Sequence, residues 1–159
     1  MRMPFRSAAA IVAACGALLT VPGAAVADDA AMKAAIPAAF DALAKKERAA
    51  SKAIRNFNRR DRATKAGRAK VRAVGRAVRT FQALLMGQQP STPQGEEARR
   101  ALMRALDLEA KATARIDLAM KSANRSSVSR TNRIIARANT TLQRANEAAR
   151  RAITLIQAL

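Results

Sequence analysis

The sequence predicts an all-α protein, and three observations lead to this class. Good helix formers, with Ala foremost, dominate the 159 residues, whereas aromatic residues make up 3% and Trp and Tyr are absent. Apolar residues recur at alternating steps of three and four, which is the spacing of one helix face. Short polar connections separate four such segments. Together these features predict an antiparallel up-down four-helix bundle that follows an N-terminal signal peptide.

The N-terminal 27 residues have the three parts of a secretory signal peptide. Arg2 and Arg6 precede an uncharged apolar stretch over residues 7–21, and the small residues Ala25 and Ala27 lie at the −3 and −1 positions of a cleavage site. We therefore expect a signal peptide over residues 1–27 and a single helical domain over residues 28–159. The protein is then exported, to the periplasm, the cell surface or the medium.

Cys15 is the only cysteine, and it offers an alternative to cleavage at Ala27. The segment from Val12 to Cys15 has the apolar-small-Cys pattern of bacterial lipoprotein signals. Apolar residues continue beyond it to Val21, however, so cleavage at Ala27 is favoured over lipidation at Cys15. The cleaved chain has no cysteine and no segment of about 20 apolar residues, so we expect neither a disulfide nor a transmembrane segment in it.

The first predicted helix starts near Asp28 and Asp29, which suit a helix N-terminus. Pro37 fits if this helix starts close to it or bends there. One apolar stripe follows, broken only by Glu47, and we expect Glu47 to pair with a Lys or Arg across the bundle. The stripe consists of Ile36, Phe40, Leu43, Glu47, Ala50, Ile54 and Phe57.

A change in the phase of the stripe predicts a break between Asn58 and Gly67. The stripe resumes as Val71, Val74, Val78, Phe81 and Leu85. Counted in heptads, a step of three residues now falls where the first stripe has a step of four, and a step of four falls where it has a step of three. Asp61 or Thr64 is placed to cap a second helix. The alternative is one long first helix in a three-helix bundle. Such a helix would reach about 90 Å, and most of one half would lack a partner.

Turn-forming residues mark the start of the last two helices. Residues 87–95 contain two Gly and two Pro, and Thr92 before Pro93 suits a helix N-terminus. The last helix follows a polar connection over residues 122–129, with Ser126, Ser127 or Ser129 as its cap. The expected inward residues are Leu102, Leu106, Ala110, Thr113, Ile116 and Met120 on the third helix, and Val128, Thr131, Ile135, Ala138, Leu142, Ala145, Ala149, Ala152, Ile156 and Leu159 on the last.

Positive charge is the main functional signal. The formal net charge is +19, and Lys45–Arg79 holds 14 Lys or Arg among 35 residues, with Glu47 and Asp61 as its only acids. A charge of this sign attracts polyanions. We expect anions to bind where the first two helices meet, at Arg59, Arg60, Arg62, Lys65 and Arg68, with Lys45, Lys52, Arg55 and Arg72 on the adjoining faces.

The chemistry of most enzymes is not available to this chain. Histidine is absent, and the cleaved chain has no cysteine, which excludes Cys and Ser-His nucleophiles and nearly every zinc site. No Gly-rich phosphate loop or calcium loop is present, and the acids are scattered. We therefore expect no enzyme activity, no catalytic residue, no cofactor and no metal site.

Three functions remain compatible with these features. The first is binding of anionic envelope or extracellular polymers or lipid headgroups through Lys and Arg. The alternative is a structural or protein-interaction module of the cell envelope, in which the charge serves solubility and the Ala-rich last helix associates with a partner or with itself. Membrane disruption ranks lowest because a bundle buries its apolar stripes. Sequence-specific nucleic acid recognition is not expected, since Phe40, Phe57 and Phe81 lie on apolar stripes.

Overall fold

The computed structural model describes residues 27–60 and 62–159, which form four helices and no strand. The helices are α2 (Ala27–Arg60), α3 (Lys65–Met86), α4 (Pro93–Ala123) and α5 (Val128–Gln157). The all-α prediction is confirmed. The long first helix of the three-helix alternative is wrong, because α2 ends at Arg60 and α3 begins at Lys65. The predicted signal peptide up to residue 26, with Cys15, lies outside the described residues, as does Asp61.

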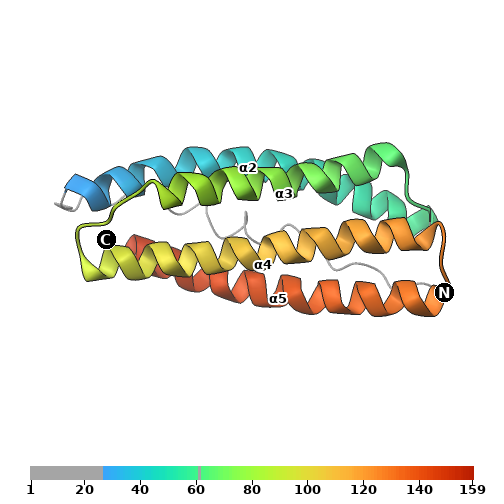
Figure 1. Ribbon diagram of the computed structural model, residues 1–159. Coiled ribbons are helices and arrows are strands. Elements are labelled where there is room, and N and C mark those ends of the chain that lie inside the picture. The colour runs from blue at the N-terminus through green and yellow to red at the C-terminus, as the bar shows by residue number, and fades with distance from the viewer. Residues whose placement is uncertain (1–26, 61) are drawn as a thin grey trace.

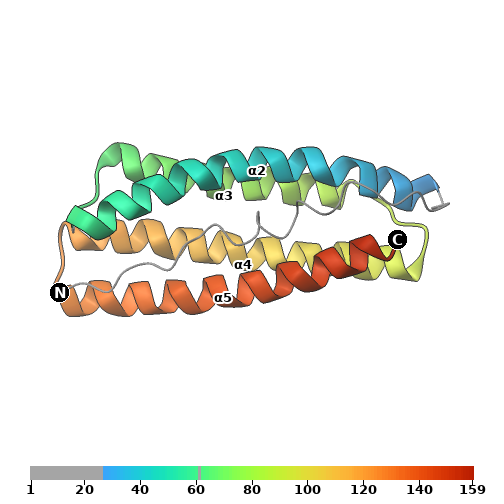
Figure 2. The ribbon, with the colours of Figure 1, turned by 180° about the vertical axis from the view of Figure 1, so that it is seen from behind.

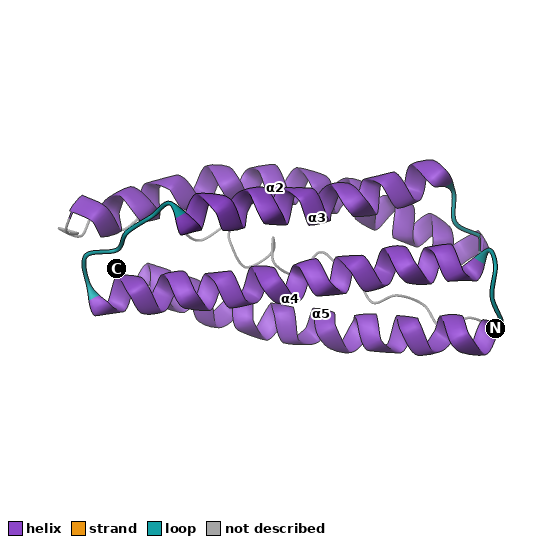
Figure 3. Ribbon diagram, in the orientation of Figure 1, coloured by secondary structure: helices purple, strands orange, loops and turns teal. Residues whose placement is uncertain are grey.

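The four helices lie side by side in two layers, with α2 and α3 in one and α4 and α5 in the other (Figure 1). The view from behind shows the same pairs (Figure 2), and the loops lie at the ends of the molecule (Figure 3). Helices α4 and α5 make the most extensive contact, and α3 connects the layers by packing on α4. Small residues at half of the inward positions of α5 allow its close approach to α4.

Three of the helices begin at hydroxyl caps that follow the sequence prediction. The side chains of Thr64, Thr92 and Ser127 accept hydrogen bonds from backbone N–H groups three residues later. Each bond satisfies one of the amides that a helix N-terminus leaves without a partner. The caps therefore fix where α3, α4 and α5 start.

The start of α2 at Ala27 agrees with the start expected near Asp28 and Asp29. The helix runs on through Pro37 with ten residues before it, so it does not start close to this proline. Burial of Met32 and Ile36 anchors this first part of the helix. Asp29 is buried and serves the loop before α4: its carboxylate accepts hydrogen bonds from the Ser91 N–H, at 3.0 Å, and from the Thr92 hydroxyl.

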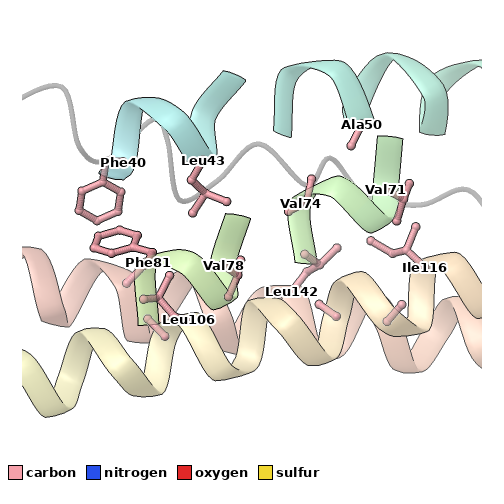
Figure 4. Packing of buried hydrophobic residues seen from close by; sticks show 14 of the residues in the cluster. Phe40, Leu43, Ala50, Val71, Val74, Val78, Phe81, Leu106, Ile116 and Leu142 are labelled. Carbon is pink, nitrogen blue, oxygen red and sulfur yellow. The ribbon is translucent and has the colours of Figure 1, made fainter. Parts of the chain in front are cut away.

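The core is a continuous apolar cluster contributed by all four helices. Phe40 of α2 and Phe81 of α3 make an edge-to-face contact with ring centroids 4.9 Å apart (Figure 4). Edge-to-face geometry places the positive ring edge against the negative ring face. Farther along, Val74 of α3 and Ile116 of α4 point into the same core. The inward positions predicted from sequence are buried, except Ala110 and Leu159, which are half-buried, and Val128, which is 42% exposed.

Two polar links connect segments about 62 residues apart at opposite ends of the molecule. At one end the Asp29 latch, defined as the two hydrogen bonds from Ser91 and Thr92 to Asp29, joins the start of α2 to the start of α4. At the other end the Asn124 latch joins the end of α4 to the residues after α2. The Asn124 amide donates to the Ala63 carbonyl at 2.8 Å and accepts from the Ala63 N–H at 3.1 Å. Helices α2 and α4 therefore run in the same direction.

The described helices include none that is both long enough and apolar enough to cross a membrane.

Candidate anion-binding corner

The connection between α2 and α3 forms two adjoining hollows, which we call the corner hollow. Five cations from α2, α3 and their connection line it: Lys52, Arg60, Arg62, Lys65 and Lys70. The buried residues Phe57, Gly67 and Met120 form the base of the inner part, and Asn124 closes the outer part. Cations on several elements thus converge on one place.

Local sequence explains why the chain takes this course. Thr64 caps α3, and the Asn124 latch holds Ala63 against the end of α4. Gly67 is buried where three helices meet: a Cβ at this position would lie 3.5 Å from the Met120 methyl and 3.6 Å from the Ala53 Cβ. The first turn of α3 contains no acid, so the positive end of the helix dipole adds to the potential of the side chains.

The five cations of the corner hollow have no acidic partner in the described chain. Over residues 27–60 and 62–159, the ion pairs that form use other cations, namely Arg68, Arg72, Arg99, Arg100, Lys111 and Arg151. Because Arg60, Arg62 and Lys65 are exposed, their charges face solvent. The site can therefore accept an anion without breaking a pair that the described residues form.

The structure divides the nine residues predicted from sequence into three groups. Arg60, Arg62, Lys65 and Lys52 line the corner hollow. Arg59, Lys45 and Arg55 are exposed on α2 but do not line it. Arg68 and Arg72 contact Asp117 of α4, and Arg68 does so with two atoms, Nε and Nη2, at 2.8 and 3.0 Å. Asp117 therefore pairs with Arg68 and attracts Arg72, so both cations are less available to an anion.

Lys70 is the cation of this site that sequence reasoning missed. It lies one turn beyond Gly67, so its spacing of three places it on the same face of α3 as Gly67. This spacing was visible in the sequence. The sequence did not show which face of α3 borders the hollow, because this depends on the contact of Gly67 with α2 and α4.

A second group of cations lies in a shallow groove between α4 and α5. Arg100 and Arg104 of α4 face Arg144 and Arg151 of α5 over a floor of Ala101, Leu108 and Ala148. Glu97 and Glu147 line the same groove, and Glu97 accepts from Arg151 at 3.2 Å. The two acids offset part of the positive charge, so the corner hollow is the stronger candidate for an anion.

Two glutamates are buried in the core, which the sequence did not predict for Glu109. Glu47 of α2 and Glu109 of α4 are 2% and 1% exposed. Burial raises the pKa of Glu47 to about 9, and the nearby charge of Glu109 adds to this effect. Burial raises the pKa of Glu109 to about 7, while its hydrogen bond from Thr113 acts in the opposite direction. The cationic partner expected for Glu47 is not found among the described residues.

The described residues bring together no three His, Cys, Asp or Glu side chains that could hold a metal ion. Comparisons with protein-family models, curated proteins and solved structures found no match. The fold and the site therefore define the protein by its structural features: it is an all-helical protein with a polycationic corner and two buried glutamates.

Proposed function

We propose that this protein is an exported antiparallel up-down four-helix bundle that binds anionic polymers or anionic lipid headgroups through the cations of the corner hollow. The observation that carries this proposal is the convergence of five cations, unpaired within the described residues, beside the N-terminus of α3. The net charge of +19 adds a long-range attraction of the same sign.

The chemistry of the site favours phosphate and carboxylate ligands. Arg60 and Arg62 offer planar guanidinium groups that can donate two parallel hydrogen bonds to such an anion. Lys52, Lys65 and Lys70 add point charges around them. Binding of a polyanion releases its counterions, so affinity falls steeply as salt rises. We propose binding rather than catalysis, because the described residues that line the corner hollow include no histidine, cysteine or carboxylate.

The alternative of a helix-mediated interaction module has less support. It relied on the Ala-rich face of α5, and this face is buried within the chain: Ala138, Ala145 and Ala152 are each 0% exposed. The apolar stripes needed for membrane disruption are buried as well. Neither surface is available to a partner without opening the helices.

A pair of variants with equal net charge tests the site. In the corner variant, Arg60, Arg62, Lys65 and Lys70 are changed to Gln. In the control variant, Lys33, Arg76, Arg79 and Arg150, which lie outside the corner hollow, are changed to Gln. Binding is measured with heparin, duplex DNA and phosphatidylglycerol vesicles over a series of salt concentrations.

We expect the corner variant to bind at least about tenfold more weakly than the control variant at moderate salt, and to show a shallower salt dependence. The three ligands separate polysaccharide, nucleic acid and lipid as sources of the anion. Equal losses in the two variants would show that the charge acts without a site. Absence of binding by the unmodified protein to all three ligands at low salt would refute the proposed function.

A further inference from the structure

The buried carboxyl groups of Glu47 and Glu109 lie at the same level of the molecule. The two latches join α2 to α4 at both ends with sequence separations of 61 to 63, and the glutamates are 62 positions apart. Burial follows the same offset: nine buried residues of α2 have a buried counterpart 62 positions later on α4. These pairs are Ile36 and Ala98, Phe40 and Leu102, Leu43 and Ala105, Ala44 and Leu106, Glu47 and Glu109, Ala50 and Ala112, Ser51 and Thr113, Ile54 and Ile116, and Phe57 and Ala119.

Each glutamate is followed by a hydroxyl side chain on the same face of its helix, one turn later. Ser51 follows Glu47, and Thr113 follows Glu109, so that both helices carry the pattern Glu-x-x-x-Ser/Thr at the same level. The Thr113 hydroxyl lies 3.4 Å from Glu109 Oε1. Two carboxylates and two hydroxyls thus form one polar layer, which the apolar pairs above and below it enclose.

Most oxygens of this polar layer have no hydrogen-bond partner in the described chain. Both carboxylate oxygens of Glu47, the Ser51 Oγ and the Oε2 of Glu109 are buried and unpartnered. Ser51 is only 8% exposed. A buried polar atom without a partner costs about 1–3 kcal/mol, so four of them in one layer require an explanation.

Residues 27–60 and 62–159 supply no buried positive charge to this layer. The buried residues of α3 and α5 are all uncharged, and the numerous Lys and Arg side chains lie on outer faces. Helix α3 also leaves room there: Gly75 has no side chain, and a Cβ at this position would lie 3.7 Å from the Thr113 methyl. When the two carboxyl groups are ionised, nothing among the described residues balances their charge, and a bound cation can supply that balance.

We propose that Glu47 and Glu109, with the hydroxyls of Ser51 and Thr113, form a binding site for one hard divalent cation in the core. This inference is independent of the anion-binding function and departs from the expectation of no metal site. Two bidentate carboxylates and two hydroxyls offer up to six oxygens, which suits Mg²⁺, Mn²⁺ or Ca²⁺. A charge of +2 neutralises the two carboxylates in a medium where an unbalanced charge is very unfavourable. Softer metals are disfavoured, because the chain has no histidine and its one cysteine is residue 15.

Mn²⁺ is a suitable probe because free and bound ions differ in their paramagnetic resonance spectra. Titration of the purified full chain after chelator treatment is expected to show one bound Mn²⁺ per chain. The net charge of +19 repels cations from the surface, so saturable binding of a single ion identifies a specific site. Glu47→Gln and Glu109→Gln are each expected to weaken binding at least tenfold. Asp107→Asn, which changes an exposed carboxylate of α4 paired with Lys111, is expected to leave it unchanged.

Two further measurements keep the test decisive if a glutamate variant fails to fold. Ser51→Ala retains both carboxylates and is expected to weaken Mn²⁺ binding several-fold. In the unmodified protein, bound Mn²⁺ is expected to broaden the methyl signals of Ile54 and Ile116, which lie about two helical turns from the glutamates, more than those of Ile36 and Ile156. No saturable binding at millimolar Mn²⁺, equal broadening at all four positions, or loss of binding in Asp107→Asn would each overturn the proposal.

Discussion

Arg68 of α3 and Asp117 of α4 form a bidentate ion pair, in which the Arg68 Nε and Nη2 lie 2.8 Å and 3.0 Å from the two carboxylate oxygens. Arg72 approaches the same carboxylate at 3.6 Å. The pair is partly shielded, with side-chain exposures of 24% and 20%. One acid therefore engages two of the cations that the sequence assigned to anion binding.

Asp117→Asn is expected to strengthen polyanion binding and to weaken the fold. Removal of the acid releases Arg68 and Arg72 beside the corner hollow and raises the net charge by one, so heparin elution should shift to higher salt. Loss of the pair should lower the free energy of unfolding by about 0.5–1 kcal/mol, because the pair is partly solvated. Asp107→Asn makes the same charge change elsewhere on α4, and an equal shift in elution for both variants would contradict the prediction.

Charge reversal in the corner hollow is expected to weaken polyanion binding more than charge reversal in the α4–α5 groove. The comparison pairs Arg60→Glu and Lys65→Glu with Arg104→Glu and Arg144→Glu, which change the net charge equally. Glu97 and Glu147 already offset the cations of the groove. Retention on heparin measures the difference, and a greater loss for the groove variant would place the principal site on α4 and α5.

Glu47→Gln is expected to stabilise the protein at alkaline pH in the presence of a chelator. The pKa of Glu47 is raised from its ordinary value of 4.5 to about 9, so ionisation favours the unfolded state. The contribution of Glu47 to the free energy of unfolding is fully present below pH 4.5 and is lost progressively as the pH rises to about 9. Glu109 acts similarly up to about pH 7. Glu47 faces Glu109 on α4, and the buried residues of α3 and α5 are uncharged.

Urea unfolding at pH 5 and pH 8 measures this effect. Because one pKa unit corresponds to about 1.4 kcal/mol, Glu47→Gln should gain at least about 1–3 kcal/mol more at pH 8 than at pH 5. The exposed Glu147→Gln serves as the control and should show no such difference. A variant that is equally stable relative to the unmodified protein at both pH values would refute the assignment of Glu47 as a buried neutral acid.

Asn124→Ala is expected to destabilise the protein and to loosen the corner hollow. The change removes the partners of both the Ala63 N–H and the Ala63 carbonyl, which should lower the free energy of unfolding by about 1–3 kcal/mol. Faster hydrogen exchange around residues 62–66 and weaker heparin binding should accompany this loss. Asn146→Ala on α5 is the matched control, and equal exchange rates in the two variants would contradict the role of the latch.

The all-α class and the four helices were predictable because their signals are local. Helical spacing located the four helices, a phase change located the break at residues 58–67, and Thr64, Thr92 and Ser127 were among the residues proposed as caps. The site was only partly predictable, since it depends on contacts between helices. The approach of Asp117 to Arg68 depends on how α3 and α4 pack together, for which a single sequence has no signal. The inward position of Glu109 did have a signal, because Glu109 lies three residues after Leu106 and four before Thr113, but the sequence prediction placed Ala110 on that face instead.

The two latches also bear on how the helices find their axial alignment. Faces built from Ala, such as that of α5, offer few bulky side chains to oppose sliding by one turn. Asp29 and Asn124 can satisfy their partners at only one setting of α2 against α4. A shift of one turn would break both latches and separate Glu47 from Glu109. The two latches thus select one axial alignment among several that hydrocarbon packing alone would tolerate.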